Sequence, residues 1–335
     1  MAAALRVFSA LAIIAVSTAL PADHELLKVD PGPRYQYMSS PEGVELVDLA
    51  WKPSDLLETA RFDAETQVFF HLFTRANPTV SQPLLLGVQD ILDASNFDAS
   101  KKTVVIVHGW RNTPLHDFNV YLVHAYLQAE DVNMIMVDWS IGAGALYVVA
   151  MANNIRTGEQ VAKFVTWLNS ATGASLDNYH MIGHSLGGHQ VGIIGRNLGG
   201  EVAYITALDP AMPGWIVNPS GFKPTDGKYT EAIHTDLGFA GRVRPVADVD
   251  FYPNQGFNMP GCETKHCSHH KCIFYMAESL MNGGFTGQRC DSLWQALTRN
   301  CASSDTLPMG GTTAKPGATG IYYLTTNPLP PYSQG

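Results

Sequence analysis

Short runs of β-branched and apolar residues alternate with longer amphipathic stretches through the middle of the chain. Runs of this length, mostly bounded by Gly, Pro or Asp, predict buried strands at 66–73, 103–107, 133–137, 178–182, 202–208 and 229–234, with one more at 321–325. Residues 155–168 and 186–198 instead carry the three-to-four-residue apolar spacing of helices. The alternation predicts an α/β protein: a mostly parallel sheet covered by helices on both faces.

The strongest chemical signal lies between the run at 178–182 and the helix at 186–198. The segment Gly183-His-Ser185-Leu-Gly187 has the G-x-S-x-G pattern, placed after a predicted strand and before a predicted helix. A strand that turns sharply into a helix leaves no room for side chains beside the central residue, so glycine is needed there. The following helix directs its positive N-terminus at developing negative charge. We therefore expect Ser185 to be a nucleophile.

A serine nucleophile requires a general base and a carboxylate that orients it. In this fold the partners follow in the order Ser, acid, His, and we expect each at the end of a later strand. Asp209 directly ends the predicted strand 202–208, whereas Asp236 and Asp250 do not directly end such a run. Asp209 is therefore the predicted acid.

The spacing of residues along the chain does not identify the general base. Four histidines follow the predicted acid, and the residues alone do not choose among them: His234, His266, His269 and His270.

The oxyanion formed during ester attack needs amide N–H groups aimed at it in advance. One should be the N–H of Leu186, which follows the nucleophile, and the other the N–H of Trp110 in the turn after the strand 103–107. Gly109 lets the backbone approach closely at that turn. His108 is expected to hydrogen-bond beside the site rather than to act as the base.

The N-terminus has the features of a secretory signal peptide. Arg6 precedes an apolar run at 7–16 and the small residues 17–19, and the run is too short to span a bilayer. We expect cleavage after Ala19, so that residues 20–335 form one secreted domain with no transmembrane segment. With 21 Lys+Arg against 30 Asp+Glu, the formal charge of −9 argues against a nucleic-acid partner.

All five cysteines lie between 262 and 301. In an oxidising compartment disulfides are the default, and we expect Cys262–Cys267 and Cys290–Cys301, with Cys272 as a small buried hydrophobe. The alternative is a structural zinc site formed by thiols and imidazoles between 262 and 272, but the spacing follows no common zinc motif. We therefore expect no metal and no cofactor.

Together these motifs resemble the pancreatic-type lipase family, in the single-domain form of secreted animal and insect lipases and phospholipases A1. The resemblance covers residues 67–301 and rests on motifs in the family's order: VHGW at 107–110, MVDW at 136–139, IGHSLGGH at 182–189, ALDPA at 207–211, IHTD at 233–236, DFYPN at 250–254, MPGC at 259–262 and CSH at 267–269. It implies an α/β-hydrolase fold. It also implies that His269 is the catalytic histidine and that Cys262–Cys267 closes the base of the lid.

The sequence departs from the family's triglyceride lipases around the substrate cleft. Only four residues, 263–266, separate the lid cysteines, and the loop 237–249 is short. Both features are similar to phospholipases A1 and galactolipases and suggest activity without interfacial opening. One aspartate of the family's calcium loop matches Asp226, but Lys223 replaces the other, so calcium is expected to be lost.

Two further departures concern the partner and the substrate pocket. The 34 residues after Cys301 are too few for the lipid-binding β-sandwich of colipase-dependent lipases, so colipase is not implied. Lys271 replaces an arginine, and Ala247-Asp248 replaces a Gly-His pair, which leaves the pocket undefined. The expected function is a secreted serine hydrolase acting on carboxylic esters of phospholipid, galactolipid or glyceride at a lipid–water interface. The alternative is a catalytically silent lipid-binding or storage protein on the same scaffold.

Overall fold

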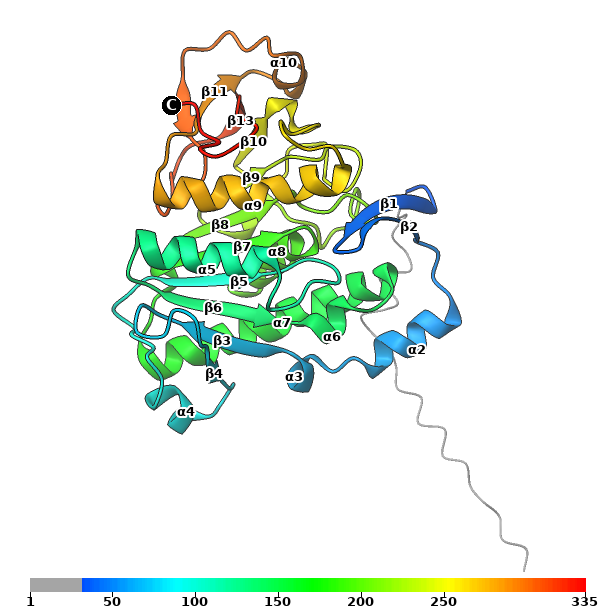
Figure 1. Ribbon diagram of the computed structural model, residues 1–335. Helices are drawn as coiled ribbons and strands as arrows, with labels where there is room; N and C mark the ends of the chain where they lie inside the picture. The colour runs from blue at the N-terminus through cyan, green and yellow to red at the C-terminus, as the bar shows by residue number, and fades with distance from the viewer. Residues whose placement is uncertain (1–31) are drawn as a thin grey trace, which may run out of the picture.

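The computed structural model describes residues 32–335, so the predicted signal peptide, 1–19, lies outside the described residues. An 11-stranded sheet forms the centre (Figure 1). Its strands, in spatial order, are β12 (Thr306–Pro308), β11 (Thr286–Cys290), β13 (Gly320–Leu324), β10 (Val249–Pro253), β9 (Thr230–Ile233), β8 (Tyr204–Leu208), β7 (Tyr179–His184), β5 (Thr103–Val107), β6 (Asn133–Asp138), β3 (Phe69–Phe73) and β4 (Gln82–Leu84). The neighbouring strands from β13 to β6 pair in parallel, and the pairings at both edges are antiparallel.

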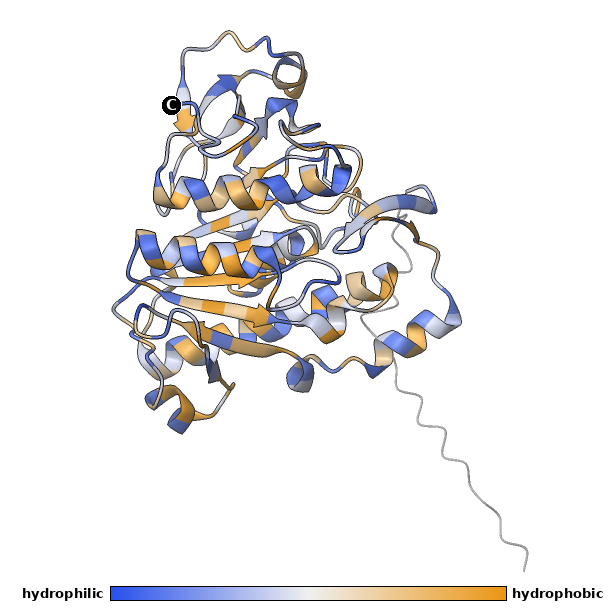
Figure 2. Ribbon diagram, in the orientation of Figure 1, coloured by the Kyte–Doolittle hydropathy of each residue, from blue (hydrophilic) through white to orange (hydrophobic). Residues whose placement is uncertain are grey.

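Helices cover both faces of this sheet. One buried cluster joins α7 (Tyr147–Thr172) and α8 (Leu186–Asn197) to one face, through alternate residues of β5 such as Val105 and Val107. A second cluster joins α5 (Asp117–Ala129) and α9 (Lys265–Met281) to the other face, through Val104 and Ile106. Figure 2 shows the hydrophobic colour concentrated along the central strands. The expected α/β-hydrolase fold, with a mostly parallel sheet between two helical layers, is confirmed.

The remaining helices are short and connect these layers. They are α2 (Pro53–Arg61), α3 (Ala64–Gln67), α4 (Gln89–Asp93), α6 (Ser140–Ala143) and α10 (Leu293–Thr298). No helix among residues 32–335 has both the length and the hydrophobicity that a membrane span requires.

Two predicted elements have wrong boundaries. The strand predicted from residue 66 begins only at Phe69, because the Asp63 side chain accepts the Glu65 N–H and starts α3 instead. The helix predicted at 155–168 runs from 147 to 172. Its first eight residues, 147–154, are all buried, so these two turns lack the exposed polar face on which the periodicity argument depends.

The first described element is separate from the main sheet. β1 (Tyr35–Ser40) and β2 (Gly43–Asp48) pair antiparallel with each other and form a two-stranded hairpin. Figure 1 shows this hairpin in blue, beyond the ends toward which the β5 and β6 arrows point. It therefore lies at the edge of the sheet where Ser185 and Asp209 follow their strands.

Candidate active site

Ser185 occupies a strained turn between β7 and α8. Its backbone has φ 58° and ψ −117°, in a region that non-glycine residues rarely adopt. A Cβ atom added at Gly183 would lie 1.9 Å from the Gly187 carbonyl oxygen, and one at Gly187 would lie 2.1 Å from the Val107 carbonyl oxygen. Both glycines of the motif are therefore required sterically.

Asp209 and His269 form a buried pair. His269 Nδ1 lies 2.6 Å from Asp209 Oδ2, and the other carboxylate oxygen accepts the backbone N–H groups of Thr235 at 2.8 Å and Asp236 at 3.1 Å. Because the carboxylate accepts the proton of Nδ1, the neutral imidazole presents an unprotonated Nε2. This is the tautomer that a general base needs.

The hydroxyl of Ser185 and Nε2 of His269 line the same small cavity, which leaves no room for a water molecule. Both atoms are buried, and neither has a hydrogen-bond partner among the described residues. Buried polar atoms are normally paired, and catalytic hydrogen bonds in unliganded enzymes commonly tighten only when substrate binds. The arrangement places an unpaired hydroxyl and an unpaired base at one reaction site.

The expectation that His269 ends a strand is wrong. His269 lies in the second turn of α9, whose first turn is capped by the Thr264 hydroxyl accepting the Cys267 N–H at 3.1 Å. The chain passes from the Cys262–Cys267 disulfide directly into this helix. The His269 backbone carbonyl also lies 3.0 Å from His184 Nε2, which ties the helix to the nucleophile turn.

The three other candidate histidines have different partners. His234 Nε2 lies 2.8 Å from Asp250 Oδ1, His266 Nδ1 lies 2.8 Å from the Ser39 hydroxyl, and His270 Nδ1 lies 2.9 Å from the His266 carbonyl. None of these contacts involves Asp209, so tertiary structure makes the choice that sequence spacing left open.

The two amides predicted for the oxyanion hole adjoin Ser185. Leu186 is the first residue of α8, and amides at a helix N-terminus have no acceptor within the helix. On the other side, a Cβ atom at Gly109 would lie 3.0 Å from Ser185 Cβ, so the Gly109–Trp110 backbone passes directly beside the nucleophile. The Trp110 indole donates to the Ala145 carbonyl at 2.8 Å and packs edge-on against Tyr147, which fixes this turn.

Asp236 is a second buried carboxylate beside the pair, and sequence reasoning gave it no separate role. Burial, and then the charge of Asp209, raise the pKa of Asp236 to about 7. Asp209, Asp236 and His269 each offer an atom within 4.8 Å of the others, which is also a geometry for a metal ion. A cation there would have to replace the 2.6 Å contact between Asp209 and His269, so the atoms fit a hydrogen-bonded Asp–His pair better than a metal site.

Asp226, the residue that matches the calcium loop, forms an ion pair with Arg196. The Arg196 guanidinium contacts its two carboxylate oxygens at 3.0 and 2.9 Å, and the Lys223 N–H donates to one of them at 3.0 Å. The two carboxylate oxygens that Asp226 would offer to a calcium ion are therefore already engaged.

The cysteines pair as expected. Disulfides join Cys262 to Cys267 and Cys290 to Cys301, and Cys272 is unpaired and buried. Burial raises the pKa of the Cys272 thiol well above its ordinary value. Two of the three thiols of the zinc alternative are thus bonded to each other.

The chain was compared with known proteins. The family model described as Lipase matches residues 48–332. Pancreatic lipase-related protein 2 of Cavia porcellus is 39% identical over 245 residues, covering 69% of this chain and 56% of that protein. Pancreatic triacylglycerol lipase of Sus scrofa is 34% identical over 313 residues, covering 82% of this chain and 68% of that protein.

The match is partial in two respects. The chain spans 56% to 59% of the length of the first three curated relatives. Among solved structures, Est1E from Butyrivibrio proteoclasticus with bound ferulic acid covers 57% of this chain and 77% of its own, at 12% identity and a TM-score of 0.31. The assignment therefore rests on sequence, and the family model alone matches well over half of the chain. The chain belongs to the Lipase family.

Proposed function

We propose that the protein is a secreted serine hydrolase that cleaves carboxylic esters of lipids through an acyl-enzyme. The observation that carries this proposal is the buried contact between His269 Nδ1 and Asp209 Oδ2 beside the strained Ser185 turn. Residues 20–335 would form the secreted lipase domain after removal of the signal peptide 1–19.

Each residue has a distinct role in the proposed reaction. His269 Nε2 removes the proton of the Ser185 hydroxyl as its oxygen attacks the ester carbonyl. Asp209 stabilises the imidazolium that forms, without itself taking the proton. The amides of Trp110 and Leu186 stabilise the oxyanion, the largest single contribution in many acyl-transfer enzymes.

His269 serves both the formation of the acyl-enzyme and its hydrolysis by water. His269 donates its proton to the departing alkoxide, which leaves as the alcohol. His269 next takes a proton from water as the water oxygen attacks the acyl carbonyl, and it returns that proton to the Ser185 oxygen as the fatty acid leaves. The proposed reaction uses no cofactor.

The substrate class is proposed as lipid esters. The relatives named above are a pancreatic triacylglycerol lipase and a pancreatic lipase-related protein. The short segment between Cys262 and Cys267 favours a phospholipase A1 or galactolipase over a triglyceride lipase with a long lid. Fatty-acid release from triolein emulsion, phosphatidylcholine and galactolipid, compared at equal enzyme concentration, tests the choice.

Ser185→Ala tests the mechanism. Ester hydrolysis should fall by several powers of ten, since loss of the nucleophile costs about 10⁶ in kcat in subtilisin. An organophosphate should label Ser185 in the wild-type protein. The control is Ser279→Ala, which should keep its activity; it removes another buried serine hydroxyl, one that donates to the Met276 carbonyl and accepts the Gly311 N–H. Retained turnover in Ser185→Ala would remove this mechanism, and an unlabelled Ser185 would favour the silent lipid-binding alternative.

A further inference from the structure

The catalytic centre is closed by the N-terminal hairpin. Ser39 and Ser40 of β1 line the cavity that holds Ser185 and His269, and only 2% of Ser185 and 1% of His269 is exposed. An acyl chain has no path to the serine hydroxyl in this state. The four residues between the lid cysteines are too few to form the cover, so it comes from the other end of the chain.

The hairpin is attached by side chains and not by the main sheet. β1 and β2 pair only with each other. The Ser39 hydroxyl lies 2.8 Å from His266 Nδ1, Glu45 forms an ion pair with Arg111, and the Tyr37 ring stacks on Phe239 with centroids 5.3 Å apart. Movement of the hairpin would therefore break no ladder of the 11-stranded sheet.

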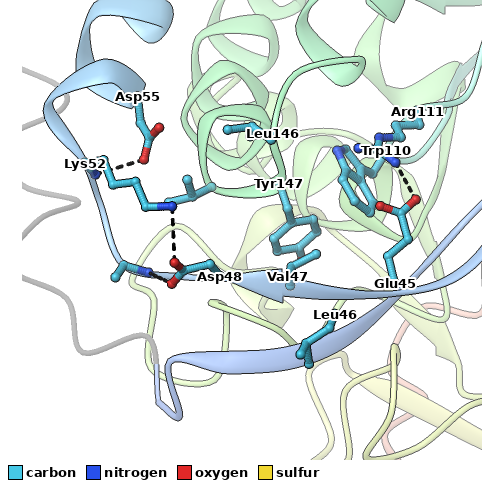
Figure 3. Close-up of a pocket in the computed structure, with 12 residues that line it drawn as sticks. Glu45, Leu46, Val47, Asp48, Lys52, Asp55, Trp110, Arg111, Leu146 and Tyr147 are labelled. Carbon is cyan, nitrogen blue, oxygen red and sulfur yellow. Dashed lines mark hydrogen bonds and ion pairs between the residues drawn. The ribbon is translucent and has the colours of Figure 1, made fainter.

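A cavity lies between the hairpin and the body of the protein. Its volume is about 210 Å³, and it lies between β2, which contributes Val47, and the side chains of Trp110, Leu146 and Tyr147. Figure 3 shows these lining side chains. Trp110 also lines the cavity at Ser185. The cavity under the hairpin is partly open to solvent, whereas Met38 and Val47 on the inner side of the strands pack into the buried cluster of α7 and α8. Opening would have to break these packing contacts as well as the side-chain pairs.

The outward side of the hairpin is apolar. Tyr35, Tyr37, Val44 and Leu46 lie on one side of the two strands, and they are 55%, 52%, 42% and 58% exposed. Ser39 and Asp48 share this side, and Tyr37 keeps half its surface exposed although its ring stacks on Phe239. Surface strands normally turn polar residues to water. Tyrosines in particular suit a lipid–water boundary, where the ring is buried and the hydroxyl stays hydrated. We call Tyr35, Tyr37, Val44 and Leu46 the outer hairpin face.

Two of the three acidic residues of the hairpin are paired with cations, and the third, Glu42 in the exposed turn, accepts the Ser40 hydroxyl at 2.9 Å. Glu45 pairs with Arg111, and Asp48 pairs with Arg34 at 2.8 Å and Lys52 at 3.3 Å. An uncharged apolar face fits a neutral lipid surface better than a charged partner. Leu146, which is 52% exposed, lines the same cavity as Leu46 and extends the apolar surface onto the body of the protein.

We propose that the outer hairpin face docks onto the surface of a lipid aggregate with net-neutral headgroups, and that docking moves the hairpin away from the Ser185 cavity. This inference rests on the proposed function. It replaces the expectation of activity without interfacial opening: the short lid remains, but the N-terminal hairpin acts as the cover.

The docking step is tested by binding, without turnover. In a Ser185→Ala background, Val44→Gln with Leu46→Gln should lower partitioning onto phosphatidylcholine vesicles at least tenfold in a sedimentation assay. The matched control is Trp294→Gln with Leu329→Gln, two apolar residues 72% and 71% exposed elsewhere on the surface. Equal partitioning of the two double variants would overturn the proposal. So would a change from dimer to monomer in Val44→Gln/Leu46→Gln with partitioning unchanged, because the face would then bind a second copy of the chain.

The opening step is tested with a soluble ester. Glu45→Gln removes the ion pair with Arg111 and should raise hydrolysis of p-nitrophenyl butyrate, below its solubility limit, by threefold or more. The control Glu65→Gln breaks an exposed pair with Lys163 and should leave the rate unchanged. An unchanged rate in Glu45→Gln would overturn the proposal. Absence of ester hydrolysis in every variant, including wild type, would instead refute the proposed function, while the vesicle assay still reports docking.

Discussion

His269 Nδ1 lies 2.6 Å from Asp209 Oδ2, although 60 residues separate them in the chain. The contact joins a helix to the end of a parallel strand, and the other oxygen of Asp209 is held by two backbone amides. The carboxylate therefore has a fixed position before any substrate arrives, and the imidazole takes its orientation from it.

Asp209→Asn should reduce kcat for ester hydrolysis by about 10⁴, the loss seen when the triad aspartate of trypsin-like proteases is replaced in this way. Asparagine can donate to Nδ1, which would place the proton on Nε2 and remove the base. Asp250→Asn is the matched control, because Asp250 is also buried and also contacts a histidine, His234, at 2.8 Å. Equal losses of kcat in the two variants would mean that disruption of any buried Asp–His contact, and not a catalytic role of Asp209, explains the reduced kcat.

Asp236 should make stability depend on pH. Its folded pKa is raised to about 7 by burial and by Asp209, against about 3.9 in an unfolded chain. The folded state thus binds the proton more tightly, so stability falls as pH rises from about 4 to about 7 and is constant above that range.

Asp236→Asn should therefore raise the melting temperature more at pH 8 than at pH 5. Thermal unfolding of wild type and variant at both pH values measures the difference. Asp90→Asn, an exposed substitution in α4, should change the melting temperature by the same small amount at both pH values. An increase in melting temperature from Asp236→Asn that is identical at pH 5 and pH 8 would contradict the raised pKa of Asp236.

The parts of the site predicted from sequence are those specified by neighbouring residues. Ser185 lies in a turn whose glycines are adjacent to it, and Asp209 directly follows β8. His269 could not be chosen by spacing, because it is in a helix and meets Asp209 only in the folded chain. The resemblance to a family identified it where local pattern did not.

The hairpin cover had no comparable signal. Its contact with α9 joins Ser39 to His266, which are 227 residues apart. Its outward residues are apolar, so alternation along β1 and β2 does not tell the buried side from the exposed one. The short lid in the sequence suggested activity without interfacial opening, whereas the burial of Ser185 beside Ser39 and Ser40 depends on contacts between distant segments that no local pattern reveals.

The two glycines after Ser185 should respond differently to alanine. Gly187→Ala would place its Cβ 2.1 Å from the Val107 carbonyl oxygen, a backbone atom that cannot rotate away, and should cost about 3 kcal/mol or more. At Gly188 the nearest atom is Pro210 Cβ at 3.2 Å, and alanine gains about 1 kcal/mol of helix propensity. Gly188→Ala should therefore stay within about 1 kcal/mol of wild type in urea unfolding, and similar losses in both variants would show that the turn is not the constraint.

Arg196→Met should destabilise the protein strongly, because it leaves Asp226 without its cation. The Asp226 side chain is fully buried, whereas that of Arg196 is 22% exposed, and removal of one partner of a buried pair typically costs about 3–5 kcal/mol. Burial already raises the pKa of Asp226, so the variant should lose more stability at pH 8, where the carboxylate is charged, than at pH 4. Lys163→Met, which breaks an ion pair with both partners largely exposed, should cost at most about 0.5 kcal/mol.

The same ion pair predicts the response to calcium. If Arg196 occupies the position of the cation, neither EDTA nor millimolar Ca²⁺ should change the wild-type melting temperature or activity. Arg196→Met removes the guanidinium from both carboxylate oxygens of Asp226, one of which still accepts the Lys223 N–H. Added Ca²⁺ should then restore part of the lost stability if the loop still has the shape of a calcium site. A wild-type melting temperature that falls on chelation would show that Arg196 does not replace the ion, and the calcium expectation drawn from Lys223 would be wrong.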